Sequence, residues 1–307
     1  MTFVLDPEGR RYELVPIDCP TCGPGARRRL GIRGGRYHRY RLGIESPIEQ
    51  CRSCGLLYPN PFPRPLDAQE MYGDPENYFA CHGDFEPECE RRRDVIRDIR
   101  SRTGMADPSI LDVGSGRGDL LEAARREGIT RCVGLELSTA MIEYARTRGL
   151  TVLDETAEEF ARRDVARFDA VVLAAVLEHV GDPSSLVEAC VGLLRPGGTL
   201  LIDVPREPNI VTWFGSVLSR IRRSPGVLNL SPTFSPYHVW GFSPRSLSAL
   251  LRKHSVTIDE TIVLANPAVP STAAALDRLK ATGGGLLIRL GNRTGTSTNM
   301  TVWATRR

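Results

Sequence analysis

The sequence predicts an α/β protein in which a small metal-binding module precedes a parallel sheet. From residue 108 onward, strand-like apolar runs alternate with helix-like stretches, the pattern that builds a parallel sheet with crossover helices. A glycine-rich turn, GSGRG at 114–118, follows the first of these strands. Two C-x2-C pairs lie upstream of it. Together these features indicate a nucleotide-type ligand site and a bound metal ion.

The bulk composition is that of an ordinary soluble protein. The chain has 307 residues, 41% of them hydrophobic and 25% charged, which suits one large domain with a small one, or two domains. The longest apolar run, AVVLAAVL at 170–177, is far shorter than the ~20 residues of a membrane helix. No secretion signal is visible at the N-terminus, so we expect a cytoplasmic protein with reduced or metal-bound cysteines.

Composition divides the chain into three zones. Residues 1–65 contain the paired cysteines and a proline-rich exit, and are predicted to form a zinc ribbon. Residues 66–105 are predicted to form a helical linker, and residues 106–307 the α/β domain. The net charge of +3 is uneven, because the first 65 residues carry eleven Arg against six acidic residues.

The α/β zone is predicted element by element from hydrophobic period and turn signals. Strands are expected at 109–113, 131–136, 151–154, 168–174, 198–204, 255–264 and 299–306. Helices are expected at 118–127, 138–147, 157–163 and 183–194. The turn RPGG at 195–198 is expected to end the last of these helices, and the aromatic-rich stretch 205–243 to form a lid over the ligand site.

The spacing of the glycines narrows the choice of ligand. A dinucleotide fingerprint reads G-x-G-x-x-G, whereas Gly114, Gly116 and Gly118 read G-x-G-x-G. No Lys follows the turn, as a phosphate-binding P-loop requires. Acidic residues stand before the turn, at Asp112, and at the end of the next strand, at Glu136. Carboxylates suit ribose hydroxyls and a positively charged ligand, so S-adenosylmethionine fits better than a phosphate-bearing nucleotide.

Four motifs follow one another along the α/β zone: ILDVGSGRG, GLELS, FDAVVLAAVLEHVGDP and LLRPGGTLLIDVP. Together they resemble class I S-adenosylmethionine-dependent methyltransferases over roughly residues 106–307. This resemblance implies a seven-stranded Rossmann-like methyltransferase sheet whose last strand is antiparallel. A Rossmann-like enzyme that uses another nucleotide is the competing interpretation.

The resemblance also implies where the cofactor binds. The glycine turn would line the methionyl end, Glu136 would hold the ribose, and Leu137 would pack on adenine. The loop after the third strand would face the polar edge of adenine. The implied cofactor-binding residues are Asp112, Gly114, Ser115, Gly116, Gly118, Glu136, Leu137, Thr156, Ala157, Glu158 and Ala174.

The cysteine pairs predict a closed four-sulfur metal site. Cys19 and Cys22 are separated from Cys51 and Cys54 by 28 residues, and two such pairs can surround one tetrahedral ion. Because no open coordination position remains, the expected ion is structural Zn²⁺. A redox dithiol is the alternative. The continuation CGLLYPNPFPRP resembles the zinc-binding N-terminal part of some bacterial methyltransferases, including sugar C-methyltransferases, which continue into a further domain.

The segment between the cysteine pairs leaves two kinds of partner open. ARRRLGIRGGRYHRYR, residues 26–41, carries seven Arg together with Tyr37 and Tyr40. Arg for phosphate and Tyr for base stacking would suit RNA, as in zinc-bearing ribosomal-RNA methyltransferases. However, the rest of the chain is slightly acidic, so a solvated loop or a pocket for an anionic small molecule is preferred.

Two of the five histidines are candidates for a general base. His179 follows the fourth strand at the carboxyl edge of the sheet, where ligands of such sheets bind, and Glu178 beside it is expected to anchor the loop. His238 lies in the predicted lid. Methyl transfer to a hydroxyl or amine benefits from a base that takes the proton. The aromatic residues expected to contact the acceptor are Trp213, Phe214, Tyr237 and Trp240.

The sequence therefore predicts an enzyme that transfers a methyl group from S-adenosylmethionine to a small organic acceptor. Oxygen or nitrogen is the favoured site of methylation, and secondary metabolism is a plausible setting. RNA or protein modification guided by the zinc module is the first alternative, and a sugar C-methyltransferase-like activity is another. A protein that binds the cofactor without using its methyl group is the third.

Overall fold

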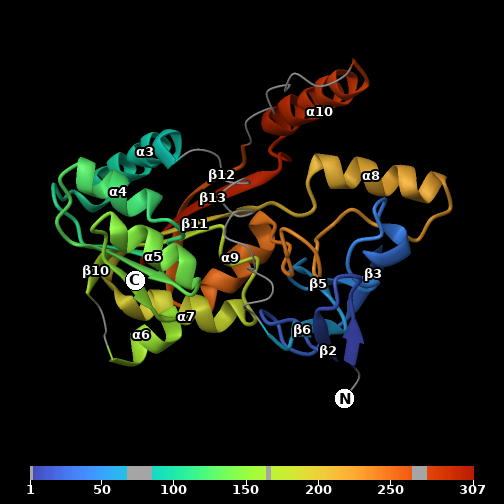
Figure 1. Cartoon of the computed structure of the whole chain (residues 1–307), viewed down its shortest axis with the longest axis horizontal. Helices are drawn as coiled ribbons and strands as arrows, with labels where there is room; N and C mark the ends of the chain where they lie inside the picture. The colour runs from blue at the N-terminus through green and yellow to red at the C-terminus, as the bar shows by residue number, and fades with distance from the viewer. Residues whose placement is uncertain (1–2, 68–84, 164–166, 265–274) are drawn as a thin grey trace.

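A computed structural model describes residues 3–67, 85–163, 167–264 and 275–307, and its centre is a seven-stranded sheet (Figure 1). The strand order is β12-β13-β11-β10-β7-β8-β9. The central strands pair in parallel, whereas β13 is antiparallel to both of its neighbours, as expected. The strands are β7 (Ile110–Val113), β8 (Cys132–Glu136), β9 (Val152–Asp154), β10 (Phe168–Ala174), β11 (Leu194–Pro205), β12 (Val256–Ile262) and β13 (Asn299–Arg306).

The helices cover both faces of this sheet. Side chains of α3 and α4 pack on one face, and those of α6, α7 and α9 on the other. Alternation within one strand explains the two layers, because Ala170 and Val172 of β10 face the first layer while Val171 and Leu173 face the second. The helices are α3 (Phe85–Thr103), α4 (Asp119–Arg126), α5 (Thr139–Thr147), α6 (Ala157–Arg163), α7 (Pro183–Leu193) and α9 (Pro244–Arg252).

The structure of the α/β zone differs from the prediction in two respects. β11 begins at Leu194, so the RPGG turn lies at the start of the strand, and α7 already ends at Leu193. Three helices were not predicted: α8 (Ile210–Ile221), α9, and α10 (Ala275–Thr294). α8 and α10 contact each other beside the sheet (Figure 1). None of the helices in the described ranges combines the length and apolarity that crossing a bilayer requires.

The N-terminal strands form two small sheets with the orders β1-β2-β6 and β3-β4-β5. They are held to the segment 205–243, which also reaches the carboxyl edge of the large sheet. Leu57 and Gly241 exchange two backbone hydrogen bonds of 3.1 and 2.9 Å, so the segment bridges the two parts. Its action as a lid stays a prediction. The elements are β1 (Phe3–Leu5), β2 (Arg11–Val15), β3 (Arg27–Arg33), the 3-10 turn η1 (Gly35–Tyr37), β4 (Ser46–Cys51), β5 (Leu57–Pro59) and β6 (Phe62–Pro65).

Candidate functional site

The glycine turn lies at the carboxyl end of β7 and is packed on its neighbours. Gly114 and Gly118 have φ values of 69° and 82°, which side-chain-bearing residues rarely adopt. A Cβ atom at Gly114 would lie 2.5 Å from Val176, which follows β10. A Cβ atom at Gly118 would lie 2.6 Å from Leu150. The glycines therefore let the turn pass close to two other loops, and its backbone reaches the edge of the sheet.

Glu136 ties this turn to the end of β8. Its carboxylate accepts hydrogen bonds from the backbone N–H groups of Gly116 at 2.8 Å, Leu137 at 2.8 Å and Ser138 at 2.9 Å. Asp112, on the neighbouring strand, is buried, and burial raises its pKa to about 7 against the opposing charge of Arg92. The two acidic residues selected from the sequence thus lie on adjacent strands of one edge.

The remaining predicted cofactor residues lie along the same edge. In the sheet, β10, β7, β8 and β9 are consecutive neighbours, so the loops that follow them form one row. Ser115 and Ala157 are buried, Leu137 is 48% exposed, and Thr156 caps α6 through Glu159. Glu158 and Ala174 are half-buried. The predicted residues thus lie in one row of loops, and the contact of each with the cofactor stays a prediction.

Glu178, His179 and His238 come together beside the glycine turn. His238 is carried by the segment 205–243, whose Val239 and Trp240 N–H groups donate to the Glu178 carbonyl at 2.9 and 3.2 Å. Nε2 of His179 lies 3.7 Å, and Nε2 of His238 4.0 Å, from Oε1 of Glu178. The two imidazole centroids are 5.0 Å apart. The sequence identified both histidines, but it did not indicate that Glu178 would join them.

Burial makes this cluster uncharged near neutral pH. It raises the pKa of Glu178 to about 8 and lowers that of His179 to about 4. Burial and the neighbouring His179 lower the pKa of His238 to about 3. Neither carboxyl oxygen of Glu178 has a hydrogen-bond partner within the described ranges. Both imidazoles are therefore neutral and keep a lone pair, while the lowered pKa values make them weaker bases than an exposed histidine. The donor atoms, all within 4.8 Å, could also hold a cation.

The raised pKa of Glu178 predicts a pH-dependent stability. Between its unfolded value of 4.5 and about 8, the folded protein retains a proton that the unfolded chain has released. Folding is therefore favoured at low pH, and this contribution is lost as pH rises, by up to about 1.4 kcal/mol per pH unit. In urea unfolding from pH 5 to 8, Glu178→Gln should lack this decline. Parallel pH curves for both proteins would contradict the assignment.

The four aromatic residues expected at the acceptor site lie in different settings. Trp240 is 2% exposed, donates its indole N–H to the Val180 carbonyl at 2.6 Å and stacks on Phe62, so it packs with the core. Trp213 and Phe214 are exposed on α8. Tyr237 accepts a hydrogen bond from Arg10. The acceptor contacts of all four residues stay predictions.

A cavity of about 370 Å³ opens next to His238. The segment 205–243 provides one wall, including Phe234 and Glu207. The other wall comes from the end of β3 and the residues after it, including Arg33 and Arg39. The sequence did not predict that these two distant stretches would meet. Its only signal was the Arg-rich composition of residues 26–41.

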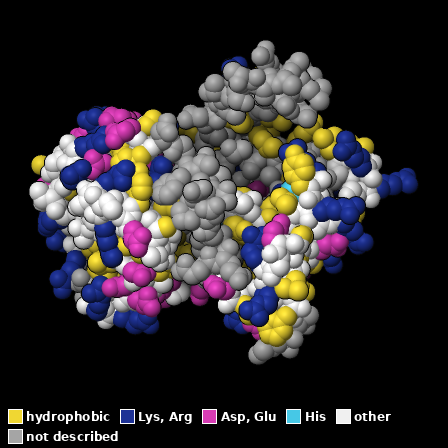
Figure 2. Space-filling model, in the orientation of Figure 1, with side chains coloured by type: hydrophobic (Ala, Val, Ile, Leu, Met, Phe, Trp, Pro, Cys, Tyr) yellow, Lys and Arg dark blue, Asp and Glu magenta, His cyan; other side chains and the backbone are white. Residues whose placement is uncertain are grey.

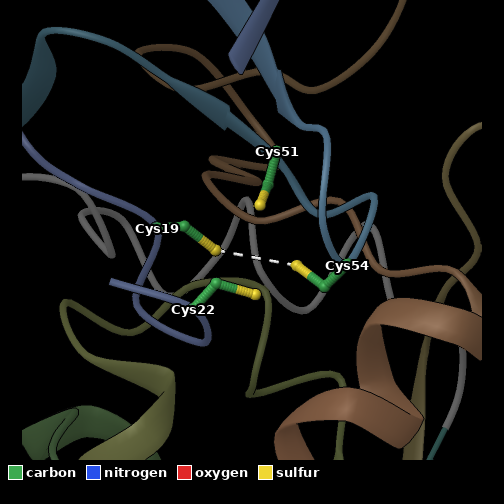
Figure 3. A group of neighbouring side chains, drawn as sticks. All are labelled: Cys19, Cys22, Cys51 and Cys54. Carbon is green, nitrogen blue, oxygen red and sulfur yellow. Dashed lines mark hydrogen bonds between the residues drawn. The ribbon is translucent and has the colours of Figure 1, made fainter. Parts of the chain in front are cut away.

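The four cysteines converge as predicted (Figure 3). Cys19 and Cys22 come from the turn between β2 and β3, Cys51 ends β4, and Cys54 lies in the turn before β5. All four sulfur atoms lie within 4.8 Å of one another, and those of Cys19 and Cys54 are 3.6 Å apart. Bonds of about 2.3 Å to a tetrahedral Zn²⁺ place sulfurs about 3.8 Å apart, so the arrangement fits this ion.

Comparison with known proteins agrees with this geometry. A family defined as a methyltransferase domain matches residues 89–260. The ubiquinone biosynthesis O-methyltransferase of Serratia proteamaculans is 35% identical over 148 residues, 46% of this chain and 61% of that protein. The enzyme of the same name from Alkalilimnicola ehrlichii is 41% identical over 106 residues, 33% of this chain and 42% of its own. The chain thus spans less than two thirds of these relatives.

Solved structures share the fold. The plantazolicin methyltransferase BamL, in complex with a desmethyl analogue and SAH, superposes with a TM-score of 0.51 at 14% identity, covering 78% of this chain and 94% of BamL. A complex of the Haloferax volcanii Trm112 methyltransferase activator with a methyltransferase gives 0.50 at 19% identity, covering 74% and 96%. The sheet, its glycine turn and the matched domain lead to one conclusion: this chain belongs to the methyltransferase domain family.

Proposed function

We propose that this enzyme methylates a small-molecule acceptor, with oxygen as the favoured atom. The observation that carries the proposal is the uncharged Glu178, His179 and His238 cluster at the carboxyl edge of β10. The glycine turn contacts the same loop through Val176, three residues before His179. A cofactor in the row of loops from β10 to β9 and an acceptor beside His238 would therefore be neighbours.

S-adenosylmethionine supplies an activated methyl group whose carbon–sulfur bond breaks as the acceptor's bond to carbon forms, leaving a neutral thioether. Glu136 and the glycine turn would hold the nucleoside and methionyl ends. His238 would take the proton that the acceptor hydroxyl loses, since a neutral imidazole has a free lone pair. His179 and the Glu178 carboxyl would orient this imidazole, and burial would keep water away from the reacting atoms.

The curated relatives support oxygen as the methylated atom, because they are named as O-methyltransferases. The contacts of the Arg-rich segment favour a small acceptor over RNA. Arg27 pairs with Glu49 at 2.9 Å and Arg36 with Glu45 at 3.0 Å, so part of its charge is already matched. On the face drawn in Figure 2, basic side chains are dispersed among acidic ones rather than gathered in one patch.

Two structural assignments accompany the proposal. Residues 1–65 would form the zinc module, 66–105 a connecting region and 106–307 the catalytic domain. Within the connecting region, α3 packs on α4 and on the sheet, with Ile96 and Ile99 fully buried. The four cysteines would hold Zn²⁺ as a closed structural site.

Calorimetry with S-adenosylmethionine and S-adenosylhomocysteine tests the cofactor site. Glu136→Gln should weaken the binding of both compounds by about 10-fold or more. A hydrogen bond to a charged group, here from the ribose to the Glu136 carboxylate, contributes roughly 1.5 to 3 kcal/mol. Glu260→Gln on β12, at the far edge of the sheet, is the control and should bind normally. Thermal unfolding of each variant checks the fold. No heat with either compound, while NADH or ATP titrates, would refute the proposed site.

A further inference from the structure

The cavity beside His238 is lined by more basic than acidic side chains, which methyl transfer alone does not require. At about 370 Å³ it falls in the range typical of small-ligand pockets, about 300 to 1,000 Å³. His238 lies at its wall together with Phe234, whereas Arg33, His38 and Arg39 enter from the N-terminal segment. The same cavity thus joins the proposed base to a group of basic side chains from another part of the chain.

Two of these cations form no direct ion pair among the described residues. The Arg33 guanidinium donates from Nε to the Leu230 carbonyl at 2.8 Å and lies over the Phe234 ring at 4.9 Å. Arg39 lies over the Tyr40 ring at 4.2 Å. Neither forms an ion pair within the described ranges, in contrast to Arg36, which pairs with Glu45. The cavity is therefore lined by two guanidinium groups that no carboxylate in the described part of the chain contacts directly.

Glu207, the acidic residue in the lining of the cavity, is hydrogen-bonded to other side chains of the protein. Glu207 accepts hydrogen bonds from Asn229 at 2.6 Å and Thr212 at 3.0 Å, and burial raises its pKa to about 7. Glu207 and Arg33 form no ion pair, and their opposite charges attract only at longer range. His38 is the third basic residue that lines the cavity. Its pKa is lowered by burial and by the positive charges of Arg33 and Arg39. The positive charges of Arg33 and Arg39 therefore act on other groups that line the cavity.

We propose that the acceptor carries an anionic group, a carboxylate or a phosphate ester, held by Arg33 and Arg39. Its ring or apolar part packs on Phe234, and its nucleophilic atom faces His238. Arg suits either anion, since its planar guanidinium presents several N–H donors. The inference rests on the proposed function for the role of His238. It adds that the N-terminal segment selects the substrate.

Calorimetry with simple anions tests this pocket in the full-length protein, with and without S-adenosylhomocysteine. The probes are benzoate, phenyl phosphate and uncharged benzamide. At least one anion should bind about 10-fold or more tightly than benzamide, and Arg33→Gln or Arg39→Gln should remove that advantage. Arg36→Gln, the matched control, should keep it, and Arg33→Lys should retain part of it. Preference for benzoate or for phenyl phosphate identifies which anion the acceptor bears.

Equal binding of benzamide and both anions would overturn the proposal. So would an equal loss in the Arg33→Gln and Arg36→Gln variants, because Arg36 does not line the cavity. RNA retention that falls equally in Arg36→Gln and Arg39→Gln would assign the segment to nucleic acid instead. Anion binding in the absence of cofactor is measured independently of methyl transfer. Failure of the proposed function, seen as absent cofactor binding, is thereby distinguished from failure of this inference.

Discussion

His238→Ala should lower kcat by about 100-fold or more, because a positioned general base contributes roughly 10² to 10⁴ to such reactions. The affinity for S-adenosylmethionine should stay unchanged, since His238 belongs to the segment 205–243 and not to the loops after β7, β8 and β9. Turnover is measured as release of S-adenosylhomocysteine on any acceptor that the wild-type chain methylates. His179→Ala should have a smaller effect if His179 only orients the base.

The pH profile distinguishes a base from a structural imidazole. The pKa of His238 is lowered to about 3, so its proton-accepting form persists well below pH 6.5. The wild-type rate should therefore not show the fall near pH 6.5 that an exposed histidine base would give. Partial restoration of His238→Ala activity by added imidazole would support proton transfer at this position.

Three further measurements separate a base at His238 from a structural or metal-binding role. His254→Ala replaces a histidine that contacts Ser184 on α7 and should retain full activity. Cofactor calorimetry shows whether each variant still binds its methyl donor. Full turnover in His238→Ala would remove that residue from the mechanism. Loss of wild-type activity with EDTA, restored by a divalent cation, would instead make Glu178, His179 and His238 a metal site, against the base assignment.

The sequence predicts the sheet well because its signals are local. β10 and β13 were expected with the bounds that the structure gives, since each is a continuous run of strand-forming residues. The missed helices also have local signals. α8 begins with a capping box at Asn209, and α9 begins with Ser243 followed by proline at the first helical position. In α10, three consecutive glycines, 283–285, obscure the helical pattern.

The candidate site is predictable only where its residues are neighbours in sequence. The glycine turn and the cysteine pairs carry their spacing with them, so their chemistry is visible from the start. The cavity depends on long-range docking, because Arg33 and His238 lie about two hundred residues apart and meet only when the two parts pack. The burial of Trp240 is likewise set by long-range packing, so its position in a long connection did not indicate it.

Cys54→Ser should cost the protein its metal and much of its stability. Elemental analysis of the wild-type chain should give one Zn²⁺ per chain, and the variant should give much less. The cluster is part of the core, where Cys19, Cys51 and Cys54 pack with Leu56 and Tyr58. Structural zinc contributes about 10 to 16 kcal/mol of apparent binding free energy in small domains, so we expect a fall in Tm of about 10 °C or more.

The physical reason for so large an effect lies in the four sulfurs themselves. The Cys54 thiol lowers the pKa of Cys19 to about 5 by hydrogen bonding, so at least one thiolate is present even before an ion binds. Without an ion, the hydrogen bond to Cys19 raises the pKa of Cys54 and burial raises that of Cys22, so these thiols stay protonated and no metal bonds hold the four side chains together. Cys132→Ser, a half-buried cysteine on β8, is the matched control and should retain the metal. A metal-free wild-type protein that unfolds at the same temperature with and without chelator, or one with a Cys19 to Cys54 disulfide, would favour the redox interpretation over structural zinc.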